Sequence, residues 1–169
     1  MDLGLRGKKA LMSGASRGLG RACAFALARE GVDVTIVART RETLEKTCDE
    51  IAKATGVKTT PVVGDITKKE TRQAAVAACP APDILLNNAG CNIRKPAVDV
   101  TWDDWNTILD TNLRGTFFMA QAIARHMIPR KKGRIVNIGS VTSVFGYAGL
   151  TPYSASRGGV KQMTMSLAD

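Results

Sequence analysis

The chain has 169 residues, of which 44% are hydrophobic and 23% are charged, and it contains 16 glycines. This length is enough for one domain with a buried core, and the composition excludes a disordered chain. The formal net charge of +9 at pH 7 is typical of a soluble protein with a mildly basic surface, and the alternative is that some of the excess cations contact an anionic ligand such as a phosphate.

The first half of the chain alternates short apolar runs with amphipathic segments. Residues 9–12 predict a strand, residues 13–20 a glycine-rich loop, and the next segment a helix that ends at Gly31. Pro61 has no amide proton, so the strand that contains it is expected near an edge of the sheet. The remaining predicted elements of this half are a strand over 32–38, a helix ending near Gly56, a strand over 57–63 and a helix over 68–79.

The second half continues the alternation. Residues 83–86 predict a short buried strand that runs into an Asn-Asn-Ala-Gly segment. A short helix around Trp105, a longer helix over 113–127, a strand over 134–138 and a helix from about Tyr153 follow. Strict β-α alternation predicts a mostly parallel sheet with helices on both faces, which is a three-layer Rossmann fold in a single domain over residues 1–169.

The glycine-rich loop has the spacing GxxxGxG, formed by Gly14, Gly18 and Gly20. Glycines allow a tight turn with positive φ and a close approach of the backbone to a pyrophosphate. The helix that follows would present free amides to the phosphates. No Gly-Lys-Ser/Thr closes the loop, which excludes a P-loop. A tight strand-to-helix turn without a ligand remains the alternative.

The end of the second strand distinguishes the two nicotinamide dinucleotides. A carboxylate at this place would bond a ribose 2′-hydroxyl, but residues 34–38 lead instead into Arg39. A guanidinium group suits a 2′-phosphate, and Arg17 in the loop could reach the same group. The sequence therefore predicts NADP(H) as the cofactor and disfavours NAD(H).

Hydride transfer to a carbonyl needs a proton donor and polar groups that position the oxygen. Tyr153 and Arg157 lie four residues apart and share one helix face, where the cation favours the phenolate. Ser140 follows a strand at the carboxyl edge of the sheet, where ligands bind. The two hydroxyl groups could converge on one substrate oxygen. The alternative is a packing tyrosine and an ordinary loop serine.

The remaining polar residues point to no other site. The four cysteines are too dispersed for a CxxC motif, and His126 is interpreted as a helix-surface residue, so no metal is expected. No apolar run resembles a signal peptide or a membrane span, which predicts a cytoplasmic protein without a membrane partner. The basic run over 130–134 lacks interleaved aromatics, so nucleic acid is not expected. We interpret it as the solvated end of a helix.

Several motifs, in order, resemble the short-chain dehydrogenase/reductase family over essentially the whole chain. Residues 13–20 resemble its TGxxxGxG loop, and Asp65 its aspartate near the adenine. Asn88, Ala89 and Gly90, preceded by Asn87, match its NNAG motif. Asn112, Ser140, Tyr153 and position 157 match its Asn, Ser and YxxxK set. The nearest resemblance is to reductases of 3-oxoacyl carrier-protein thioesters and of keto-sugar acids such as gluconate.

The resemblance implies an oxidoreductase that interconverts a carbonyl and a secondary alcohol. It implies that Tyr153 is the general acid/base, that Ser140 polarises the carbonyl, and that Asn112 holds a water in a proton relay. Position 157 would assist the tyrosine and bond the nicotinamide ribose. A homodimer or homotetramer is also implied. The predicted cofactor contacts are Gly14, Ser16, Arg17, Gly18, Leu19, Gly20, Arg39, Asp65, Ile66, Asn88, Ala89, Gly90, Tyr153 and Arg157.

Two departures from the family pattern keep a second hypothesis open. Position 157 is Arg where the family has Lys, and a guanidinium does not readily release a proton. The chain also stops at Asp169, where family members continue with two more strands and a substrate-binding loop. We therefore expect the C-terminal strands to be missing and one sheet edge to be open. The alternative function is a non-catalytic dinucleotide-binding or interaction protein that keeps the fold.

Overall fold

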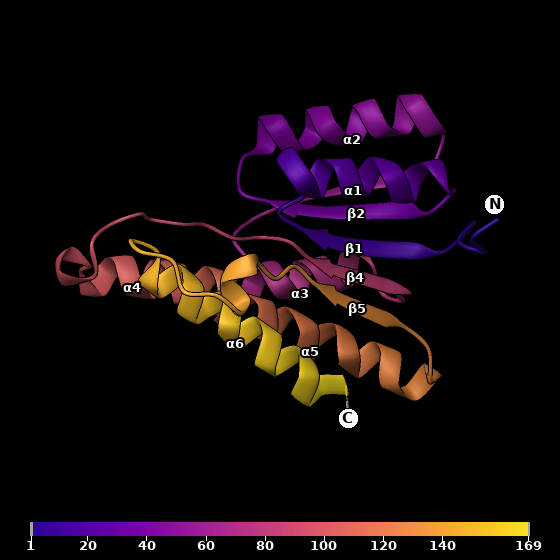
Figure 1. The fold of residues 1–169 in the computed structure, drawn as a ribbon. Helices are drawn as coiled ribbons and strands as arrows, with labels where there is room; N and C mark the ends of the chain where they lie inside the picture. The colour runs from indigo at the N-terminus through magenta and orange to yellow at the C-terminus, as the bar shows by residue number, and fades with distance from the viewer. Residues whose placement is uncertain (1, 169) are drawn as a thin grey trace.

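The computed structural model describes residues 2–168 and contains a parallel sheet of five strands in the order β3-β2-β1-β4-β5 (Figure 1). The predicted alternation of strands and helices is confirmed. The strands are β1 (Lys9–Ser13), β2 (Asp33–Ala38), β3 (Thr59–Val63), β4 (Ile84–Asn87) and β5 (Arg134–Asn137). The helices are α1 (Gly18–Arg29), α2 (Arg41–Thr55), α3 (Lys69–Ala78), α4 (Trp102–Leu109), α5 (Gly115–Met127) and α6 (Thr151–Ala168).

Two hydrophobic cores form on the two faces of the sheet, because strand residues alternate between them. In β1, Met12 packs into the core beneath α1 and α2, while Leu11 packs into the core beneath α3 and α5. Both side chains are fully buried. Burial on both faces is typical of parallel strands, which therefore read as continuous apolar runs. Figure 1 shows α1 and α2 on one side of the sheet and α5 and α6 on the other.

The two edges of the sheet follow from the sequence in different ways. Pro61 pairs with Ile36 in register, and β3 has no second neighbour in the described residues. The expectation that the proline strand lies at an edge is thus confirmed. β5 forms the other edge, and its Val136 is 45% exposed.

The segment between β4 and β5 differs from the prediction of two separate helices. α4 continues through the π-helical turn η2 (Asp110–Arg114) directly into α5. Thr101 begins α4 with a capping box, in which it accepts a hydrogen bond from the Asp104 amide. The π-turn contains Asn112, whose side chain is fully buried. A π-turn has no simple sequence period, so the apolar spacing did not predict it.

The basic run over 130–134 is exposed, as predicted, and two of its residues also contact the segment that precedes β4. The run begins at Arg130, the last residue of the 3-10 turn η3 (Ile128–Arg130), and the Arg130 guanidinium donates hydrogen bonds to the carbonyl oxygens of Ala81 and Pro82. Lys132 and Arg130 also lie near the carboxylate of Asp83, which accepts a hydrogen bond from the Lys9 amide. Part of the positive charge therefore holds the start of β4 in place.

Candidate functional site

The loop between β1 and α1 passes so close to the end of β4 that side chains are excluded from it. Gly14 has a φ of +67°, and a Cβ atom there would lie 2.6 Å from the Cα of Ala89. Gly20, in the first turn of α1, packs against the loop. A Cβ atom on Gly20 would lie 2.5 Å from the Gly14 carbonyl oxygen. Gly18, by contrast, has a φ of +56° and open space around its missing side chain. The first and third glycines are therefore needed for packing, and the second faces outward.

Hydrogen bonds join the glycine loop to the Asn-Ala-Gly segment after β4. The Asn88 side-chain amide donates to the Gly14 carbonyl oxygen at 2.8 Å. The Ser13 hydroxyl accepts from the backbone amides of Asn88 and Ala89, each at 3.2 Å. Ser13 is itself nearly fully buried. The two loops thus form one rigid unit at the carboxyl edge of the sheet, where ligands bind in open α/β folds.

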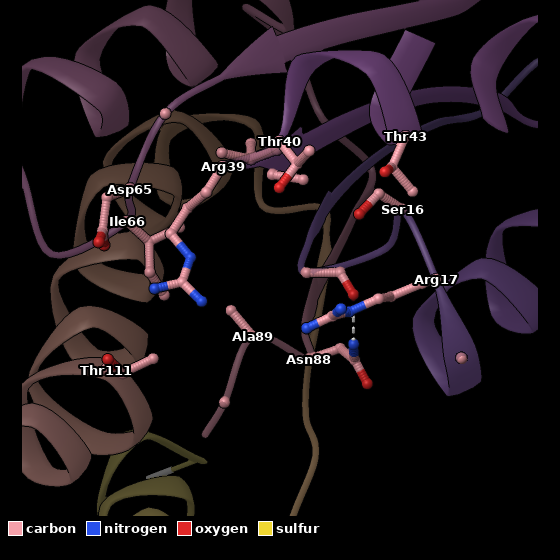
Figure 2. Close-up of a pocket in the computed structure, with 16 residues that line it drawn as sticks. Ser16, Arg17, Arg39, Thr40, Thr43, Asp65, Ile66, Asn88, Ala89 and Thr111 are labelled. Atoms are coloured by element: carbon pink, nitrogen blue, oxygen red, sulfur yellow. Dashed lines mark hydrogen bonds between the residues drawn. The ribbon is translucent and has the colours of Figure 1, made fainter. Parts of the chain in front are cut away.

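A pocket of about 330 Å³ opens at this edge (Figure 2). That volume lies near the lower end of the roughly 300–1,000 Å³ of small-molecule sites. Ten of the predicted cofactor residues line it: Gly14, Ser16, Arg17, Gly18, Arg39, Asp65, Ile66, Asn88, Ala89 and Gly90. Leu19, Gly20, Tyr153 and Arg157 are not among its lining residues. Leu19 is 60% exposed and Gly20 is packed against the loop.

The pocket is positively charged. Figure 2 shows the guanidinium groups of Arg17 and Arg39 extending into it from opposite sides. Neither group forms an ion pair within residues 2–168. Asp65 is the one carboxylate among the lining residues, and it accepts a hydrogen bond from the Thr67 amide at 2.9 Å. Arg17 is also the N-cap of α1 and makes no side-chain cap hydrogen bond, so the first-turn amides remain available to an anion.

The predicted catalytic residues lie together beside this pocket, on η2, α6 and the loop after β5. The Ser140 hydroxyl oxygen accepts hydrogen bonds from the amide and the hydroxyl of Thr142, at 3.1 and 3.0 Å. Its own proton has no acceptor in the described residues. Tyr153 lies in the first turns of α6 with its side chain half-buried. The Arg157 guanidinium carbon lies 5.3 Å from the centre of the Tyr153 ring.

Asn112 connects three parts of this region through its side chain. Its amide nitrogen donates to the Cys91 carbonyl oxygen at 2.9 Å and to the Ser156 hydroxyl at 3.0 Å. Its amide oxygen accepts from the Cys91 backbone amide at 2.8 Å. Ser156, which is fully buried, donates in turn to the Tyr153 carbonyl oxygen at 2.7 Å. Asn112 therefore fixes the loop after β4 to the helix that carries Tyr153.

Comparison with known proteins agrees with this geometry. The family model described as short chain dehydrogenase matches residues 8–169. The chain belongs to the short-chain dehydrogenase family. It is 41% identical over 168 residues to gluconate 5-dehydrogenase of Gluconobacter oxydans (strain 621H), an alignment that covers 97% of this chain and 65% of that protein. The chain thus spans less than two thirds of that relative's length.

Solved structures of related dehydrogenases superpose closely on this chain. A gluconate 5-dehydrogenase from Burkholderia cenocepacia J2315, in complex with NADP and tartrate, aligns with a TM-score of 0.89 and 36% identity, covering 96% of this chain and 65% of that one. An NAD⁺-bound xylitol dehydrogenase aligns with a TM-score of 0.91 and 32% identity, covering 97% and 65%. The Rossmann-type fold is therefore shared, whereas the cofactors named for these two structures differ.

Some residues of this short-chain dehydrogenase site were not predicted from the sequence. Thr40 and Thr43 line the pocket just after β2, and their place at the carboxyl end of a strand was the available signal. Thr111 lines the opposite side from the π-turn, for which the sequence offers no comparable signal. Within the described residues, no cluster of three or more His, Cys, Asp or Glu could hold a metal, and no helix is both long and apolar enough to cross a membrane.

Proposed function

We propose that this chain binds NADP(H) and forms the cofactor-binding part of an oxidoreductase that interconverts a carbonyl and a secondary alcohol. The observation that carries the proposal is the pair of unpaired guanidinium groups, Arg17 and Arg39, in the pocket beside the glycine loop. A 2′-phosphate is the dianion that suits such a pair, and a carboxylate at the end of β2 would repel it. Arg39 occupies that place instead.

The residues present fit this cofactor. The open space around Gly18 and the free first-turn amides of α1 suit a pyrophosphate. On the other side of Arg39, Asp65 and Ile66 would lie beside the adenine, and Asn88 to Gly90 would contact the centre of the cofactor. NAD(H) is the second candidate cofactor, since one similar structure is described as NAD⁺-bound.

The bound nicotinamide supplies the hydride, and the chain's own residues handle the proton and the substrate oxygen. Ser140 has a free hydroxyl proton because its oxygen accepts from Thr142, so we propose that it donates a hydrogen bond to the substrate carbonyl. Tyr153 then delivers its phenolic proton to that oxygen. The Arg157 charge near the Tyr153 ring stabilises the phenolate that remains.

Asn112 contributes to this chemistry through position. Both of its amide protons are already donated, to Cys91 and Ser156. We therefore assign it chiefly to holding Tyr153 in place by way of Ser156. Its backbone carbonyl oxygen accepts from the Thr116 hydroxyl, and the water relay implied by the family resemblance remains a prediction.

Fluorescence titration with NADPH and NADH tests the cofactor assignment. We expect NADPH to bind at least about tenfold more tightly, because a charge-assisted hydrogen bond is worth about 1.5–3 kcal/mol. Arg39→Ala should remove most of this preference. Arg41→Ala is the matched control, since Arg41 pairs with Glu45 on the exposed surface of α2 and does not line the pocket. Equal affinities of the unmodified chain for the two cofactors would contradict the assignment.

We also propose that the protein is a cytoplasmic homodimer or homotetramer acting on a small carbonyl or alcohol substrate. A groove of about 550 Å³ between α4, α5 and α6 is lined by Trp105, Leu113, Phe117 and Met163 among others. A second copy would cover this apolar surface. All four cysteines are free, as expected of a reducing compartment. Sedimentation velocity measures the association, and a purely monomeric species at micromolar concentration would contradict it.

A further inference from the structure

The Arg157 side chain is buried and contacts other segments of the protein. It is only 6% exposed, and its Nη1 donates a hydrogen bond to the Ile138 carbonyl oxygen at 2.8 Å. Its Nη2 lies directly against the backbone of Gly90, where a Cβ atom would overlap it. The Arg157 carbonyl oxygen accepts from the Ser143 hydroxyl at 2.9 Å. The residue thus joins the segments after β4 and β5 to α6.

This arrangement makes the guanidinium costly to redirect toward a ligand. If it turned away, the Ile138 carbonyl oxygen would lose its donor, and an unsatisfied buried polar group costs about 1–3 kcal/mol. The Nε proton is buried and has no acceptor in the described residues, so a ligand could reach it only after Arg157 had moved. A planar guanidinium fork also adapts less readily to a new partner than a lysine ammonium on its flexible stem.

The pocket on the other side of Gly90 is different, because its cations are free. Arg17 and Arg39 extend into it without ion-pair partners, and its lining includes no residue of α6 or of the loop after β5. The lining residues are the last two residues of β2, Thr111, and residues of the segments that follow β1, β2, β3 and β4. Donors that need no rearrangement are therefore concentrated where the adenosine and phosphate groups are proposed to bind.

From this contrast we infer that Arg157 is a positioning residue that makes no contact with the cofactor, and that the 2′-phosphoadenosine half carries nearly all of the binding affinity. The inference rests on the proposed function, since it concerns the same pocket. The inference widens the class of ligands expected in this pocket to adenosine nucleotides with a 2′-phosphate, with or without nicotinamide.

Isothermal titration calorimetry of the unmodified chain with NADPH and with adenosine 2′,5′-bisphosphate tests the inference directly. We expect the two dissociation constants to agree within about threefold to fivefold, which corresponds to less than about 1 kcal/mol. NADPH binding more than about thirtyfold tighter would overturn the inference and leave the proposed cofactor in place. Binding of neither ligand would overturn the proposed function as well.

Arg157→Lys provides a second test that does not depend on catalysis. A lysine ammonium would leave the space beside Gly90 open and could turn toward the ribose, so NADPH should bind about tenfold more tightly while the bisphosphate is unaffected. Lys161→Arg, one turn further along α6 at an exposed position, is the matched control and should change neither affinity. An unchanged ratio in Arg157→Lys, in a variant whose circular dichroism is native, would show that Arg157 does not set the balance between the two halves.

Discussion

The glycine loop allows backbone strain and steric overlap to be measured separately. Gly14→Ala introduces both, because φ is +67° and the new Cβ would lie 2.6 Å from the Cα of Ala89. A left-handed backbone costs a non-glycine residue about 1–2 kcal/mol, and overpacking costs about 1–3 kcal/mol. The free energy of unfolding should therefore fall by about 2–5 kcal/mol, a large part of the roughly 5–15 kcal/mol of a typical domain.

Two neighbouring glycines are matched controls for the two contributions. Gly18→Ala has strain without overlap, since nothing lies within 4 Å of its Cβ, and should cost about 1–2 kcal/mol. Gly20→Ala has overlap without positive φ, because its Cβ would lie 2.5 Å from the Gly14 carbonyl oxygen, and should cost about 1–3 kcal/mol. Urea unfolding followed by circular dichroism measures all three. If Gly18→Ala destabilised the chain as much as Gly14→Ala, the contact with Ala89 would not be what requires glycine.

Two further predictions concern catalysis and pH. Tyr153→Phe should abolish carbonyl reduction, measured by NADPH absorbance in a form that has activity, while NADPH affinity stays nearly unchanged because Tyr153 does not line the pocket; retained turnover would show that another group supplies the proton. A hydrogen bond from Lys95 lowers the pKa of Asp104 from 3.8 to about 2. Its carboxylate therefore stabilises the fold fully above pH 3.8, and this contribution is lost as the pH falls through about 2. The difference in unfolding free energy between Asp104→Asn and the unmodified chain should shrink over that range, and a constant difference would exclude the carboxylate charge as its source.

The order of elements could be predicted from the sequence because it depends on local patterns. Apolar runs alternate with helical periodicity along the chain, and parallel strands need such crossovers. Pro61 indicated its own edge position because a proline cannot donate to a second neighbour. Arg17 and Arg39 could be predicted to line one pocket because the loop and the strand end that carry them meet at the same edge of the sheet, and their contact with a ligand remains a prediction.

Other features depended on contacts that sequence distance conceals. The need for glycine at position 14 comes from Ala89, which belongs to a different strand end. The π-turn at Asn112 is held by hydrogen bonds to Cys91 and Ser156, and neither partner is adjacent in the chain. No local pattern encodes such pairings, because they form only when separate elements pack together.

Position 157 shows most clearly which properties follow from the sequence alone and which require the tertiary structure. The sequence by itself determined that a cation stands one helical turn after Tyr153, because a helix places such residues on one face. Only the tertiary structure decided what that cation binds. The Ile138 carbonyl oxygen and the Gly90 backbone reach Arg157 from two other strand ends, and the choice between protein and ligand is set by which acceptors the folded chain leaves within reach.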